Sequence, residues 1–130
     1  MHSLRDHEKS VRAKCYREEG GGLMGKFLIL WRSNLAAPAP QAPAEYLEFM
    51  EKIWAGVDGL RKKGLVKEVG NFLDGISGYA IAEGEAAEVY NAMSMFLPFV
   101  AAEAVHEIIS YEKGKEIDRA RLKARIEAAK

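Results

Sequence analysis

The chain is poor in several features that would narrow its function. It has a single cysteine, Cys15, which excludes an internal disulfide and favours a reducing cytoplasm. Its 19 basic residues balance its 19 acidic residues, so no net charge points to nucleic acid or an anionic membrane as a partner. No apolar run approaches a bilayer span, and the first residues lack the apolar core of a secretory signal. We therefore expect a cytoplasmic protein that binds neither nucleic acid nor membrane.

Motifs for metals and cofactors are absent as well. The histidines His2, His7 and His106 are scattered, and no paired cysteines or H-x-x-x-H spacing accompany them. Neither a phosphate-binding loop nor a G-x-G-x-x-G motif occurs, and the glycines at 20–22 lack the lysine that follows in a phosphate loop. The sequence therefore predicts no bound metal and no cofactor.

What is present is one domain-sized chain with a distinct beginning. A chain of 130 residues, 48% of them hydrophobic, is long enough to bury a single core. Residues 1–24 do not match the rest, because they carry only a thin apolar stripe that ends in a glycine run. Two interpretations of this N-terminal extension stay open. Either Met24 is the native start and the residues before it are an upstream extension, or the segment is a partly helical arm.

The hydrophobic pattern after residue 24 alternates between strands and helices. Alternating or continuous apolar runs predict strands, and apolar residues at three- and four-residue steps predict helices. The expected elements, in chain order, are a strand at 26–33, a helix at 43–63, strands at 65–72 and 76–82, a helix between 83 and Pro98, a strand at 102–111 and a charged helix at 115–130. This β-α-β-β-α-β order is that of the ferredoxin-like α+β fold, a four-stranded antiparallel sheet with two helices on one face. We expect this domain over 25–113 and an extra C-terminal helix over 114–130.

Glycines mark the hairpin between the second and third expected strands. Asp74-Gly75 is a typical turn pair, so Asp74 is expected to be a turn residue and not a catalyst. Gly78 lies inside a strand, where a glycine indicates a bulge or close packing against a bulky side chain.

Two helices on one face would leave the other face of the sheet bare. That face is expected to carry too much aromatic and aliphatic surface to stay in water. A second copy packed sheet to sheet, with a cavity between the sheets, would cover it. We therefore predict a homodimer or a higher homo-oligomer. The C-terminal helix is expected on the surface or on a partner subunit, where it could exchange between subunits or build larger rings.

Four segments of residues 25–113 resemble those of a known group of proteins. They are the opening strand Lys26-Phe27-Leu28-Ile29-Leu30-Trp31, the helix end Leu60-Arg61-Lys62-Lys63-Gly64, the hairpin Gly70 to Tyr79, and Met95-Phe96-Leu97-Pro98-Phe99 before the last strand. On these segments the domain resembles the dimeric α/β-barrel superfamily, and within it the muconolactone isomerase-like proteins. The resemblance implies a small hydrophobic or lactone-like ligand, and proton transfer next to a carbonyl without metal or cofactor. It also implies acidic and basic site residues from the first helix, where the inner turns of this chain instead carry Ile53, Trp54, Ala55 and Val57.

Polar residues suited to such chemistry are few. His106, in the last expected strand, could shuttle a proton because histidine titrates near neutral pH; the alternative is a strand histidine bonded to backbone or water. Glu103 is expected on the opposite strand face from His106. It could act as a base if an apolar cleft raises its pKa, or it could simply be solvated or paired with a cation. Arg32, at the end of the first strand, could bind a substrate carboxylate with its guanidinium or form an intersubunit ion pair.

Aromatic side chains are the expected walls of a ligand pocket, since small-molecule sites are mostly apolar with few polar groups. The aromatics of the domain considered for this role are Trp31, Trp54, Phe72, Tyr79 and Phe99. The alternative is that most of them form core or dimer interface. Trp54 and Tyr79 are the preferred wall residues, because each has a polar tip that needs a partner.

The residues and the resemblance together support three hypotheses for function. The first is a small homodimer that binds a hydrophobic or lactone-like molecule, with cofactor-free isomerisation as its reaction. The second is a structural or interaction module of the same fold without an active site. The third is a cofactor-free monooxygenase acting on an aromatic substrate. An open cavity with His106 or a glutamate at its wall favours an enzyme, whereas a cleft filled by aromatic side chains favours the module.

Overall fold

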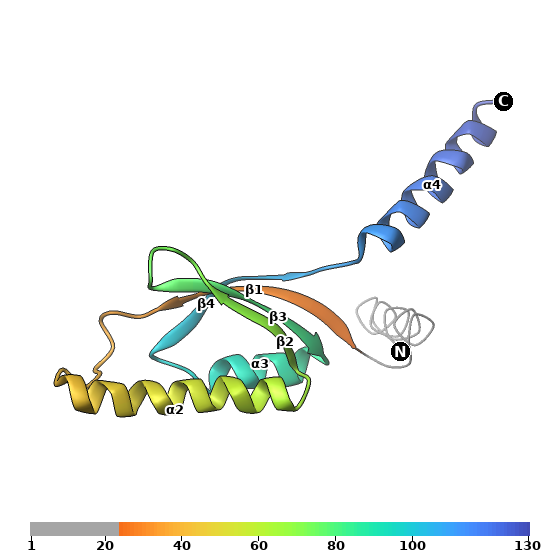
Figure 1. The fold of residues 1–130 in the computed structure, drawn as a ribbon. Coiled ribbons are helices and arrows are strands. Elements are labelled where there is room, and N and C mark those ends of the chain that lie inside the picture. The colour runs from red at the N-terminus through yellow and green to blue at the C-terminus, as the bar shows by residue number, and fades with distance from the viewer. Residues whose placement is uncertain (1–23) are drawn as a thin grey trace, which may run out of the picture.

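A computed structural model describes residues 24–130, and Figure 1 shows a sheet with two helices on one side and a third helix standing apart. The elements are β1 (Gly25–Ser33), α2 (Pro43–Lys62), β2 (Val66–Asn71), β3 (Ser77–Gly84), α3 (Ala86–Ser94), β4 (Val100–Glu107) and α4 (Tyr111–Ala128). The two interpretations of the N-terminal extension concern residues 1–23, which lie outside the described residues.

The four strands form one antiparallel sheet in the order β2-β3-β1-β4. β1 and β3 occupy the centre, where they pair from Gly25 opposite Gly84 to Arg32 opposite Ser77. Helices α2 and α3 cover one face of this sheet (Figure 1). This is the ferredoxin-like α+β arrangement with an extra C-terminal helix, as the sequence predicts.

Helix α2 begins and ends close to where its sequence predicts. Pro43 occupies the first turn, where its missing N–H leaves no helical hydrogen bond unmade. Glu45 in the first turn and Arg61 and Lys62 in the last turn complement the helix dipole. Leu60 is the only buried residue of this helix. The helix is therefore attached by a narrow stripe, and part of its apolar surface faces water.

A small core lies between the sheet and the helices. Its buried residues are Ile29, Ala80, Ala82 and Val89. Because side chains alternate along a strand, Phe27 and Trp31 lie on the same face of β1 as Ile29 and pack against this cluster. A Cβ added at Gly78 would collide with the Trp31 ring. The close packing against a bulky side chain that the sequence predicts at Gly78 is therefore confirmed.

The turn between β2 and β3 is held by the carboxylate of Asp74. Its Oδ1 accepts hydrogen bonds from the backbone N–H groups of Ile76 (2.9 Å) and Ser77 (3.0 Å), and its Oδ2 accepts one from the Ser77 hydroxyl (2.6 Å). These bonds, with that of the Ser77 hydroxyl first, lower the pKa of Asp74 because they favour the charged form. Gly75 has φ 78°, a left-handed conformation that glycine adopts freely. The predicted turn is therefore confirmed.

The C-terminal part differs from the prediction in its boundary. β4 ends at Glu107 instead of continuing to residue 111, and α4 begins at Tyr111 instead of at residue 115. The hydroxyl of Ser110 accepts a hydrogen bond from the Lys113 N–H (3.1 Å), and this bond caps the helix N-terminus. Gly114 lies inside α4, where a glycine costs only about 1 kcal/mol relative to alanine and does not end the helix.

Candidate functional site

No helix of residues 24–130 covers the face of the sheet opposite α2 and α3, which we call the open face (Figure 1). Alternation places Leu28 and Leu30 of β1 on this open face, because Ile29 between them points into the core. The strand register adds Ile81 of β3, which is opposite Leu28, and Ala104 of β4, which is opposite Leu30. All four are only partly buried in the single chain. We call Leu28, Leu30, Ile81 and Ala104 the apolar centre.

Charged pairs lie at the two ends of the apolar centre. At one end, Glu83 of β3 forms ion pairs with Lys26 of β1 (3.7 Å) and Lys67 of β2 (3.9 Å). At the other end, Nε of Arg32 donates to Oε1 of Glu103 at 2.7 Å. An apolar middle with a polar border is the usual arrangement of a protein interface.

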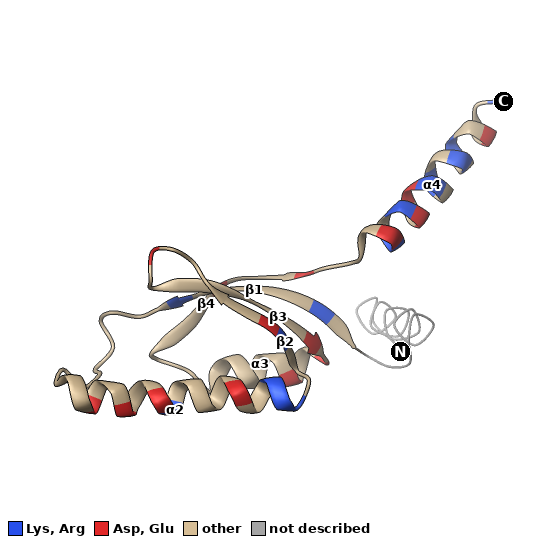
Figure 2. Ribbon diagram, viewed as in Figure 1, with Lys and Arg blue, Asp and Glu red and all other residues tan. Residues whose placement is uncertain are grey.

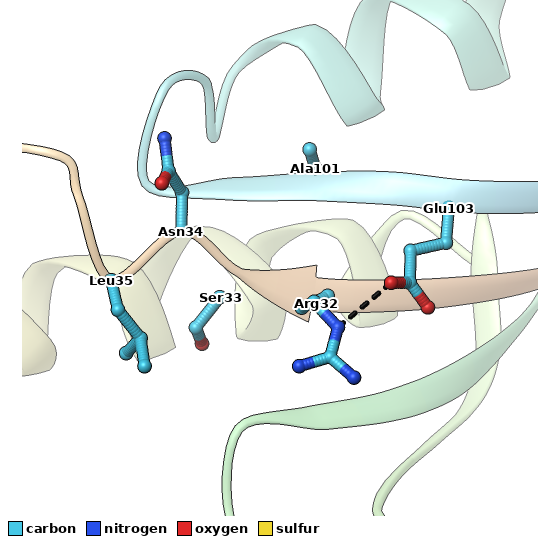
Figure 3. A pocket seen from close by; sticks show the side chains of 6 residues that line it. All are labelled: Arg32, Ser33, Asn34, Leu35, Ala101 and Glu103. Carbon is cyan, nitrogen blue, oxygen red and sulfur yellow. Dashed lines mark hydrogen bonds and ion pairs between the residues drawn. The ribbon is translucent and has the colours of Figure 1, made fainter.

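A β-bulge sets the position of Glu103. The register of β4 against β1 shifts after Leu30, and Glu103 is the extra residue on β4. Figure 3 shows Arg32 and Glu103 reaching toward each other from these neighbouring strands. Alternation alone predicts Glu103 on the strand face opposite His106. The structure corrects this, because alternation fails at a bulge and Glu103 joins Arg32 on the open face.

A hollow of about 370 Å³ surrounds this ion pair. Its walls come from the end of β1, the loop that follows and β4, and consist of Arg32, Ser33, Asn34, Leu35, Ala101 and Glu103 (Figure 3). Among residues 24–130, only Nε of the Arg32 guanidinium is engaged, so its two terminal nitrogens are available. A guanidinium binds a carboxylate through two parallel N–H groups. The chemistry of this hollow therefore suits a small acid.

Tyr79 and Phe72 come together beside the apolar centre. Their rings stack with centroids 6.1 Å apart. A hydrogen bond with the Glu68 carboxylate, followed by burial, raises the pKa of Tyr79. Gly70, the partner of Tyr79 across the hairpin, leaves room for the ring, because a Cβ there would collide with it. The phenol is therefore a neutral, hydrogen-bonded wall group near physiological pH.

His106 lies on the open face of β4, opposite Leu28 of β1. The residue is exposed, and within the described part of the chain its imidazole has no hydrogen-bond partner. Both ring nitrogens can therefore bond to a ligand or to another chain that covers this face.

Three of the predicted pocket residues lie on the helix side of the sheet. Trp31 packs against the core and donates from Nε1 to the carbonyl of Tyr79 at 3.1 Å. Phe99 meets Phe49 of α2 edge to face, with ring centroids 4.7 Å apart. Trp54 lies on α2 and is 47% exposed. The sheet separates these three side chains from the open face.

Two parts of the site are not predicted from the sequence. Ser33, Asn34 and Leu35 line the hollow directly after β1, and a loop at a strand end is a common place for binding groups. Glu68 bonds Tyr79 from the paired strand. Glu68 lies two residues before Gly70, the residue opposite Tyr79. Aligning the two strands of the hairpin would therefore have predicted that Glu68 and Tyr79 are cross-strand neighbours.

Residues 24–130 hold neither a cluster of metal ligands nor a membrane-spanning helix. Between residues 24 and 130, no three His, Cys, Asp or Glu side chains gather closely enough to hold a metal ion. No helix in this range combines the length and apolar character needed to cross a bilayer.

Comparison with known proteins identifies no relative. No family model matches the chain, and neither a curated protein nor a solved structure matches it. The ferredoxin-like fold and the open face are therefore the basis for a functional proposal.

Proposed function

We propose that this chain is the subunit of a cytoplasmic homodimer that binds a small hydrophobic molecule between two sheets. The observation that carries the proposal is the apolar centre on the open face. Covering apolar surface stabilises association by roughly 25 cal/mol per Å², and the charged pairs at both ends suit the rim of an interface. Packed sheets lie about 10 Å apart. Side chains such as His106 and Tyr79 would then border the space between the two chains.

The groups around the apolar centre favour a particular class of ligand. Leu28, Leu30 and Ile81 offer an apolar floor, and the stacked rings of Phe72 and Tyr79 offer an aromatic wall. At one end, Arg32 offers a carboxylate its two terminal nitrogens, which no group among residues 24–130 engages. These groups support a small hydrophobic or lactone-like acid as the ligand. The resemblance to muconolactone isomerase-like proteins points to the same class.

A second candidate function is cofactor-free proton transfer next to a carbonyl. The imidazole of His106 favours it, because it lies on the open face and has no hydrogen-bond partner among residues 24–130. In this reaction a ring nitrogen takes a proton from the carbon next to the carbonyl and returns it to another carbon of the same molecule. Arg32 would hold the substrate carboxylate. Glu103 is bonded to Arg32, so it would orient the guanidinium and would not act as the base.

Sedimentation equilibrium tests the homodimer. We expect a particle of twice 14.4 kDa for the native chain. Leu30→Asp should weaken association at least about a hundredfold, because it buries an unpaired carboxylate in the contact. Leu73→Asp is the matched control, since Leu73 is fully exposed at the hairpin and lies off the apolar centre. The proposal fails if the native chain is monomeric, or if folded Leu30→Asp associates as strongly as the native chain.

Thermal-shift and isotope-exchange measurements test the ligand and the reaction. Small lactones and aromatic carboxylic acids should raise the melting temperature of the native chain. Arg32→Gln should remove the effect of the acids and keep that of neutral lactones. Deuterium incorporation next to the ligand carbonyl, followed by NMR, should stop in His106→Gln while binding persists. Absence of any ligand-dependent shift would favour the non-catalytic module, and oxygen consumption with an aromatic substrate would favour the monooxygenase.

A further inference from the structure

Helix α4 has no buried residue. The pairing of β4 with β1 continues to Ile108, whose N–H bonds the carbonyl of Lys26 (2.8 Å), and Ser110 already caps the helix. This short connection leads α4 away from the sheet, whereas α2 lies on the other side of the sheet (Figure 1). Helices in proteins owe most of their stability to the packing of an apolar face, and α4 buries no such face against residues 24–130. A surface that stabilises α4 is therefore not supplied by residues 24–130 of its own chain.

One face of α4 combines two cations with two apolar side chains. Lys115, Arg119, Leu122 and Ile126 follow one another at steps of four, three and four residues, which places them on one side of a helix. Leu122 is 49% exposed and Ile126 is 59% exposed. Within residues 24–130, Arg119 has no ion pair, and Lys115 contacts only the Tyr111 ring, 5.4 Å from its centroid. We call these four residues the α4 stripe.

The outer face of α2 carries a complementary set at the same spacing. Leu47, Glu51, Trp54 and Asp58 also follow at steps of four, three and four residues; we call them the α2 stripe. Leu47 is 54% exposed, and neither Glu51 nor Asp58 has an ion pair within the described residues. Figure 2 shows acidic residues along α2 before its basic last turn, and basic residues mixed with acidic ones along α4. Two stripes of equal spacing and opposite charge are suited to pack side by side.

The direction of the match is set by the order of the residues. In an antiparallel alignment, Ile126 meets Leu47 and Lys115 meets Asp58, so the contacts at both ends of the stripes join groups of compatible chemistry. A parallel alignment would pair Arg119 with Glu51 and Leu122 with Trp54, but at both ends it would set a charge against an apolar side chain, Lys115 on Leu47 and Asp58 against Ile126. Antiparallel packing is therefore favoured, as it is between the helices of most bundles.

The middle of the antiparallel alignment is also complementary. Arg119 falls on Trp54, whose ring face attracts a guanidinium. Glu51 falls beside Leu122. Arg119 and Arg125 lie three residues to either side of Leu122, so each is within reach of the Glu51 carboxylate.

We propose that the α4 stripe of one copy docks antiparallel on the α2 stripe of a second copy of this chain. The contact is between copies because α4 leads away from its own body while its own α2 lies on the other side of the sheet. In a two-fold pair the contact forms twice, since each copy gives one helix and receives the other. It uses a different surface from the apolar centre, so it can be tested separately from the sheet-to-sheet contact.

Disulfide cross-linking in the full chain tests this contact directly. In a Cys15→Ser background, a chain with Leu47→Cys is mixed with a chain with Ile126→Cys under mild oxidation. The covalent pair should form at least about tenfold faster than in the control with Ile117→Cys, because Ile117 lies on the opposite side of α4 and docking raises only the local concentration of residue 126. Repeating the experiment with Leu30→Asp in both chains removes the sheet contact. Cross-linking at the control rate in both backgrounds overturns the proposal.

Charge reversal gives a second measurement on the same cross-linking pair. Lys115→Glu in α4 or Asp58→Lys in α2 should each slow the reaction about fivefold or more, because like charges then meet. The two changes together should restore the rate to within about twofold. Lys113→Glu makes the same charge change on the other side of α4 and should leave the rate unchanged. If the combined variant cross-links as slowly as the single ones, the proposed alignment is wrong. Sedimentation of the same chains reports separately on the sheet-to-sheet contact.

Discussion

Gly78 has no space for a side chain, because the ring of Trp31 and the carbonyl of Gly70 occupy the position of its Cβ. Gly78→Ala should therefore destabilise the fold by about 2 kcal/mol or more, as overpacking of a rigid site does. Gly59→Ala is the matched change in α2, where nothing lies near the added Cβ, and it should stabilise the protein by up to about 1 kcal/mol. Urea unfolding measures both. Equal stability of Gly78→Ala and the native chain would contradict the packing of Trp31.

The carboxylate of Asp74 should make stability depend on pH. The Ser77 hydroxyl, followed by the Ile76 N–H, holds the pKa of folded Asp74 below its usual value of 3.8. The hydrogen bonds therefore make their full contribution to the free energy of unfolding above about pH 4. This contribution is lost as the pH falls through the lower pKa of the folded state. Asp74→Asn should reduce the free energy of unfolding near neutral pH, and the difference from the native chain should shrink in acid. Urea unfolding over this range measures it, with exposed Glu48→Gln as the control. A difference that stays constant with pH would contradict the lowered pKa.

At the scale of the elements, the signals that predict this fold are local ones. The continuous apolar run of β1, the Pro43 start of α2 and the Asp74-Gly75 turn each specify an element without reference to its neighbours. The start of α4 lacks such a signal, because the apolar residues at 108, 109 and 111 suggest strand and the helix start depends on the hydrogen bond to Ser110. The Glu103 bulge could not be predicted, since it exists only in the register between two strands. The ion pair between Arg32 and Glu103, which lines the hollow, could not be predicted for the same reason.

The cap and the glycine of α4 should have opposite effects on its helix population. Ser110→Ala removes the bond from the Lys113 N–H and should disfavour the helix by about 1 kcal/mol. Gly114→Ala should favour it by about the same amount, because nothing lies near the added Cβ. NMR chemical shifts of residues 111–128 in the full chain measure the population. An unchanged population in both variants would mean that docking alone, and not these local groups, holds the helix.

At the scale of the whole molecule, the single chain buries little. Among residues 24–130, no side chain is less than 2% exposed, and the core cluster includes two alanines. The apolar centre and the α2 stripe lie on opposite sides of the sheet (Figure 1), so occupying one does not block the other. A small core with two uncovered surfaces suggests that association supplies part of the stability of the fold.

The melting temperature should therefore depend on protein concentration. For a dimer that unfolds to two chains, each tenfold rise in concentration adds about 1.4 kcal/mol, or roughly 3–5 °C for two chains of this size. Leu30→Asp and Lys115→Glu should each move the start of this dependence to higher protein concentration, and the combined variant should lose the dependence, because a monomer unfolds independently of concentration. Leu73→Asp should follow the native chain, since it touches neither surface. A native melting temperature that is constant from micromolar to millimolar protein would contradict association through both surfaces, and the small core would then have to hold the fold alone.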